Sequence, residues 1–146
     1  MRLINYKAEH LEEMLAGDMN ELARKSFGVA GDFAETLDVP GLAFTAVDNG
    51  HLVASGGVQP LWNGVGEGWF VQSGFFPKKK ISIIKLIKEN FDDIINENSF
   101  FRVQAGVRSD WRQGVRFAEY FGFQHEGIMR KYGPDGQDYH RMARIK

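Results

Sequence analysis

Three consecutive lysines, Lys78, Lys79 and Lys80, stand in the stretch GFFPKKKISIIKLI, which covers residues 74–87. The apolar side chains that follow them recur at helical spacing, so the lysines are predicted to lie at the start of a helix. A helix N-terminus carries about half a positive charge and favours acidic side chains. These cations are therefore either a solvated helix start or the sign of an anionic ligand.

Thiol and metal chemistry find no support in the composition. The chain has no cysteine, which excludes disulfides and cysteine-based metal sites. Its four histidines, at positions 10, 51, 125 and 140, show neither i,i+4 spacing nor the HExxH pattern of zinc sites. We therefore expect no metal.

Length and charge restrict the class of protein. The 146 residues, 43% of them hydrophobic, predict a single domain over residues 1–146. The net charge of −1 argues against a broad basic surface, so a nucleic-acid partner is not expected. The chain begins without an apolar signal-peptide core, and no apolar run reaches the roughly 18 residues of a membrane span. We expect a cytoplasmic protein with no membrane partner.

The periodicity of apolar residues predicts strands and helices in the order β-αα-βββ-α-β-α-ββ. The predicted strands are those at 2–6, 41–47, 51–62, 66–74, 100–107, 124–132 and 137–145. The predicted helices are two within 7–27, one from about 77 to 97 and one within 109–122. This order indicates an α+β fold with one central mixed, mostly antiparallel sheet and helices on both faces. It places the 71–82 strand-to-helix turn beside the strand at 101–106.

Turn and cap residues support these boundaries. Asn49-Gly50 supplies the positive φ angles of a tight hairpin. The pair Gly56-Gly57 predicts a β-bulge in the second strand of that hairpin. Ser109 or Asp110 is expected to cap the last helix.

The segment RVQAGVRSDWRQGVRFAEYFGFQHEGIMRKYGPDGQDYHRMARI (102–145) resembles the GNAT superfamily of acetyl-CoA-dependent N-acyltransferases. Strand, helix, GF, EG and a final tyrosine-containing hairpin follow in the order typical of that family. The ending is also similar to that of the GNAT-like internal virion proteins of podophages. The likeness extends over most of residues 2–145.

The resemblance implies a site for acetyl-CoA. In the family, the pantetheine arm pairs with a free strand edge, and the pyrophosphate binds backbone N–H groups at the next helix start. The implied cofactor-binding residues are Val71, Gln72, Ser73, Lys78, Lys79, Lys80, Ile81, Ser82 and Asp110. The family loop has small residues where this chain has Lys78, Lys80 and Ser82. Either the lysines neutralise the phosphates as point charges, or their side chains fill the site.

The resemblance also implies catalytic roles. Glu67, on the strand before the loop, stands where many members have a carboxylate general base. The alternative is a strand glutamate paired with a cross-strand cation. The family's usual general acid is a tyrosine at the position of Ala118. Tyr120 is the nearest substitute, although two residues rotate it by about 200° around the helix, and it is alternatively a packing aromatic.

Three functions remain open from the sequence. The first is transfer of an acetyl group from acetyl-CoA to an amine of a protein or small molecule. The second is a non-enzymatic phage protein that uses a degenerate GNAT scaffold for virion assembly or for binding a host protein, in the host cytoplasm or the virion. The third is an acyl-CoA sensor that binds without turnover.

Overall fold

The computed structural model describes residues 1–27, 33–77 and 81–146. It confirms the predicted order and the predicted fold class, because its strands form one mixed sheet in the order β1-β2-β3-β4-β5-β7-β6. The strands are β1 (Arg2–Asn5), β2 (Ala43–Asp48), β3 (His51–Trp62), β4 (Val65–Gln72), β5 (Arg102–Arg108), β6 (Gln124–Met129) and β7 (Tyr139–Ile145). The helices are α1 (Ala8–Ala16), α2 (Glu21–Phe27), α3 (Ile81–Glu97) and α4 (Arg112–Tyr120).

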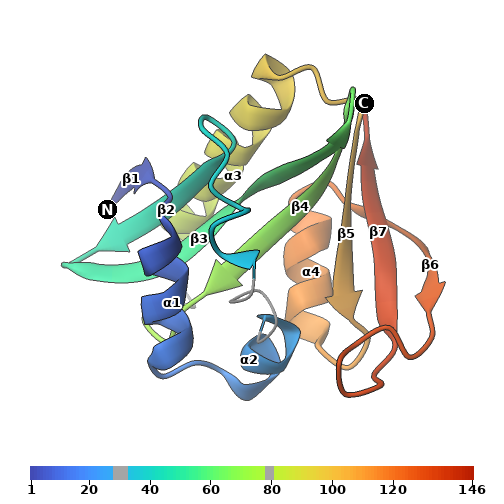
Figure 1. Cartoon of the computed structure of the whole chain (residues 1–146), viewed down its shortest axis with the longest axis horizontal. Coiled ribbons are helices and arrows are strands. Elements are labelled where there is room, and N and C mark those ends of the chain that lie inside the picture. Colours follow the sequence, from blue (N-terminus) through green and yellow to red (C-terminus); the bar gives the residue numbers. More distant parts are fainter. Residues whose placement is uncertain (28–32, 78–80) are drawn as a thin grey trace.

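Helices cover both faces of the sheet (Figure 1). On one face, α3 and α4 pack over a large core that includes Ile87 and Val103. On the other, α1 packs over a smaller core with Leu11 and Val71. Side chains alternate between the faces along a strand, and β2, β3 and β4 contribute side chains to both cores. Within the described residues, no helix is both long and apolar enough to span a lipid bilayer.

The β2–β3 hairpin turns at Asn49 and Gly50, whose φ angles are +50° and +77°, as predicted. The bulge predicted at Gly56-Gly57 is wrong, because both glycines keep regular pairing with β2 and with β4. The register shifts instead between Ala46 and Val47, and between Pro60 and Trp62. Gly57 is needed for another reason: a Cβ there would lie 2.1 Å from the carbonyl oxygen of Leu42.

The feature that shapes the candidate site is the divergence of β4 and β5. These strands are parallel and keep register over only three pairs, the last being Glu67 with Gln104. Beyond that point β4 remains paired with β3 to Gln72, and β5 remains paired with β7 to Arg108. The two strands therefore separate within the sheet, and Figure 1 shows α4 beside the opening.

Candidate functional site

Glu67 lies where β4 and β5 begin to separate. It is opposite Gln59 of β3 and opposite Gln104 of β5. Directly paired residues project from the same face of a sheet, and alternation from Val71 places this face under α1. The Glu67 side chain is 31% exposed, so a ligand in the opening can reach its carboxylate.

An arginine from the far side of β5 holds this carboxylate. Nη1 of Arg141, on β7, donates to both oxygens of Glu67, at 3.0 Å and 3.3 Å. Arg141 pairs with Gly106 of β5, and a residue without a side chain leaves the guanidinium room to cross that strand. Glu67 is thus paired with a cation, which is the alternative expected from the sequence. The same residue stands where the resemblance implies a general base.

A second ion pair lies beside the first. Arg102 donates from Nη2 and Nη1 to the two oxygens of Glu126, at 2.7 Å and 3.0 Å, and from Nε to Oε1 of Gln104 at 3.2 Å. The hydrogen bonds from Arg102 lower the pKa of Glu126 below its ordinary value. Two carboxylates and two arginines therefore form a group of zero net charge, which we call the charge quartet: Glu67, Arg102, Glu126 and Arg141.

Two buried polar atoms on the same face lack hydrogen-bond partners within the described residues. They are Oε1 of Gln59 and Nε1 of Trp69. Gln59 is directly opposite Glu67, and Trp69 lies two residues after Glu67 on β4. The rings of Trp69 and Tyr6 form an edge-to-face contact with their centroids 5.1 Å apart. A buried polar atom without a partner costs about 1–3 kcal/mol. Bound water or a ligand at this face would reduce that cost.

The predicted cofactor residues at the end of β4 offer backbone rather than side chains. Val71 is 1% exposed within the core under α1. Ser73 is bonded to β3, with its N–H donating to Val53 at 3.0 Å and its hydroxyl to Leu52 at 2.7 Å. Because backbone groups alternate between the two edges of a strand, those of Gln72 point into the opening.

The predicted phosphate loop is described only in part. Lys78, Lys79 and Lys80 lie outside the described residues. The helix α3 begins directly after them, and its first two residues, Ile81 and Ser82, are exposed. The described start of α3 is therefore accessible, as a phosphate site requires.

Asp110 has a different role from the predicted helix cap. The N-terminal cap position of α4 is Trp111, and neither Ser109 nor Asp110 occupies it. Instead, Arg108 donates from Nε and Nη2 to the two oxygens of Asp110, at 2.9 Å and 3.1 Å, which lowers the pKa of Asp110. Nη1 of the same arginine donates to Asp135 at 3.0 Å. Arg108 thus fastens the β6–β7 loop to the end of β5, and Asp110 is a second partner of its guanidinium.

Tyr120 is the last residue of α4 and is 47% exposed, with its ring against the edge of Phe121. Ala118, at the position of the family tyrosine, packs against the core under α3 and α4. In the described part of the chain, no hydrogen bond or ring contact connects Tyr120 with Glu67. The structure therefore brings together Glu67, Gln59, Trp69 and Arg141, and it leaves Tyr120 apart from them.

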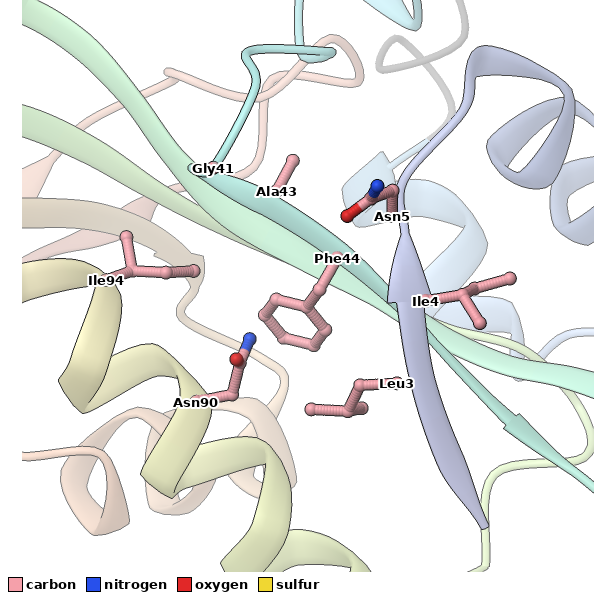
Figure 2. Close-up of a pocket in the computed structure, with 8 residues that line it drawn as sticks. All are labelled: Leu3, Ile4, Asn5, Gly41, Ala43, Phe44, Asn90 and Ile94. Atoms are coloured by element: carbon pink, nitrogen blue, oxygen red, sulfur yellow. The ribbon is translucent and has the colours of Figure 1, made fainter.

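A pocket of about 250 Å³ lies elsewhere, between β1, β2 and α3 (Figure 2). Its lining has no titratable side chain, and none of the predicted site residues belongs to it. The residues that line it are Leu3, Ile4, Asn5, Gly41, Ala43, Phe44, Asn90 and Ile94. This pocket is separate from the opening between β4 and β5.

Comparison with solved structures identifies the fold. Ard1 from Thermoplasma volcanium matches with a TM-score of 0.75 at 16% identity, over 99% of this chain and 96% of that one. Ribosomal-protein-alanine N-acetyltransferase from Brucella melitensis matches with a TM-score of 0.73 at 14% identity, over 100% of both chains. An acetyltransferase of the GNAT family from Streptococcus pneumoniae gives 0.71 at 13%, over 99% and 98%.

This chain has the GNAT acetyltransferase fold. No protein-family model and no curated protein sequence matches it. At sequence identities this low, the structural similarity establishes the fold alone and does not assign an activity to this chain. Arg141 and Gln59 were not singled out by the sequence as site residues, because their proximity to Glu67 depends on strand register.

Proposed function

We propose that this protein is an N-acetyltransferase that moves an acetyl group from acetyl-CoA to an amine. The observation that carries the proposal is the opening between β4 and β5 with Glu67 at its closed end. A strand edge inside a sheet has backbone groups that no neighbouring strand satisfies, and an amide-containing arm of a ligand can satisfy them.

The residues of the opening are compatible with such a ligand. The backbone of Gln72 faces the opening, and the exposed start of α3 at Ile81 and Ser82 follows in the chain. In our proposal, Lys78, Lys79 and Lys80 supply positive charge for the phosphates. When bound, acetyl-CoA supplies a thioester whose acetyl carbon is open to attack by an amine.

Glu67 is the proposed general base. The amine nitrogen forms a bond to the acetyl carbon, the carbon–sulfur bond breaks, and the proton lost by the nitrogen passes to Glu67 directly or through water. The sulfur leaves as a thiolate and takes its proton from water, because Tyr120, the proton donor expected from the resemblance, lies apart from Glu67. Because Arg141 holds Glu67, the incoming amine competes with a guanidinium for the same carboxylate.

The test is a thiol-release assay with acetyl-CoA and a panel of amines, together with calorimetric titration of acetyl-CoA. We expect Glu67→Gln to lower kcat by about 100-fold or more while acetyl-CoA still binds. The matched control is Glu119→Gln on α4, which removes a carboxylate outside the site. Absence of acetyl-CoA binding in the wild-type protein would overturn the proposal.

A second candidate function is a non-enzymatic one, in which a degenerate GNAT scaffold serves virion assembly or binding of a host protein. The observations that favour it are Ala118 at the tyrosine position and the occupation of Glu67 by Arg141. It predicts no acetyl-CoA binding and a protein partner captured from infected cells. An acyl-CoA sensor is the third case, recognised by acetyl-CoA binding without transfer to any amine.

A further inference from the structure

Three arginines project from the face that carries Glu67, and they differ in how fully their donors are used. All three guanidinium nitrogens of Arg102 donate hydrogen bonds to Glu126 or Gln104. All three of Arg108 donate to Asp110 or Asp135. Every guanidinium nitrogen of these two arginines therefore already has a protein partner.

Arg141 is different. Within the described residues, its hydrogen bonds all come from one nitrogen, Nη1, which serves both oxygens of Glu67. Its side chain is 22% exposed. A guanidinium offers five N–H donors in a planar fork that matches a carboxylate. Nε and Nη2 of Arg141 therefore have no hydrogen-bond partner among the described residues.

The residue paired with Arg141 on β5 has no side chain. Arg141 is opposite Gly106, an exposed residue of β5 without a side chain. A Cβ at Gly106 would lie 3.3 to 3.7 Å from side-chain atoms of Met129, Tyr139 and Tyr132. These side chains already line the position above Gly106, and the glycine itself adds no side chain between them and Arg141.

The charge quartet restricts the charge of the acceptor. Its two carboxylates are matched by its two arginines, so the quartet itself has no surplus negative charge with which to hold a polycation. A zwitterion fits a balanced site, because its ammonium can face Glu67 while its carboxylate faces Arg141. In an α-amino acid those charges are separated by a single carbon atom, which suits a Glu–Arg pair in direct contact at 3.0 Å.

We propose that Arg141 binds the carboxylate of the acceptor, so that the acceptor is a free α-amino acid whose amine lies at Glu67. This inference rests on the proposed function. In this arrangement Arg141 selects the substrate and draws its amine towards the base. The carboxylate of the acceptor also gives Arg141 a second anionic partner, which loosens the hold of the guanidinium on Glu67.

The test compares L-amino acids with their amides, which keep the amine and lose the negative charge. Binding is measured by calorimetry and by thermal shift without acetyl-CoA, and transfer by thiol release with it. We expect the amino acids to bind about tenfold or more tightly than their amides, as for loss of a charged hydrogen-bonded pair. Spermidine serves as the polycation in the same panel.

Arg141→Gln should remove the preference for the amino acid over its amide, and Arg141→Lys should keep part of it. The matched control is Arg116→Gln on α4, which removes an exposed arginine outside the charge quartet and should leave the preference unchanged. Equal or tighter binding of the amides or of spermidine would overturn the inference, as would an equal effect of the Arg116 variant. The titration of acetyl-CoA tests the proposed function separately. Transfer of the acetyl group to spermidine alone would support the acetyltransferase activity and would exclude an α-amino acid as the acceptor.

Discussion

At the scale of single residues, Arg108 shows how a charged side chain can be structural. It is 2% exposed, and it connects the end of β5 with Asp110 and with Asp135 of the β6–β7 loop. Its pKa is raised, chiefly by the hydrogen bonds with Asp110, so it stays charged. A buried charge of this kind is stabilising only as long as its partners remain in place.

We therefore expect Arg108→Ala to lower the free energy of unfolding by about 2 kcal/mol, because two carboxylates lose their partner and a buried volume is vacated. Urea unfolding followed by circular dichroism measures this. Arg102→Ala is the comparison, since its pair with Glu126 is more exposed and such pairs contribute little. Equal losses of unfolding free energy in the two variants would show that the burial of Arg108 does not increase its contribution to stability.

The ion pair between Glu67 and Arg141 illustrates the limit of prediction from sequence for single residues. Glu67 was identified because the resemblance to the GNAT superfamily implies a carboxylate at its position on the strand before the loop. Its partner Arg141 is 74 residues away in the chain, and their contact depends on the registers of β4, β5 and β7 together. No local pattern contains that information.

At the scale of elements, the order of strands and helices was predictable because apolar periodicity and turn residues are local signals. The glycine pair in β3 was misinterpreted, since a glycine can mark either a bulge or a close approach of two backbones. At Gly57 the cause is the carbonyl of Leu42, which is close to β3 because the N–H of Val58 donates to it at 2.9 Å.

Gly57→Ala should therefore destabilise the protein by about 2 kcal/mol or more, because the added methyl group meets backbone that cannot move aside without breaking that hydrogen bond. Thermal unfolding provides the measurement. Gly127→Ala on β6 is the control, since a Cβ there meets nothing within 4 Å. A Gly57→Ala protein as stable as the Gly127→Ala protein would contradict this account of the β2–β3 contact.

At the scale of the whole molecule, Asp92 connects α3 to the sheet. It accepts hydrogen bonds from Lys88 on its own helix and from Arg144 of β7. Burial acts to raise the pKa of Asp92, but these two hydrogen bonds outweigh it and place the pKa below the ordinary value of 3.8. The folded state thus holds the charged carboxylate more firmly than the unfolded chain does.

The direction in which the stability of the protein changes with pH follows from this lowered pKa. The contribution of Asp92 is complete above pH 3.8 and is lost as the pH falls through the lower pKa of the folded state. We expect the stability of the wild-type protein to fall more steeply below pH 4 than that of Asp92→Asn, as measured by urea unfolding at each pH. Parallel curves for the two proteins would contradict this role of Asp92.

The separation of β4 from β5 also bears on the solubility of the protein. A strand at the rim of a sheet, such as β1 or β6 here, can be extended by a strand of another molecule, which is a route to aggregation. The free edge of β4 is inside the sheet, in a gap that closes at Glu67 and has α4 beside it. A slender chain of a ligand can enter such a gap, whereas a full β-strand of a neighbouring molecule cannot. The unpaired edge of β4 is therefore not a template for self-association in the way that an edge at the rim of the sheet is.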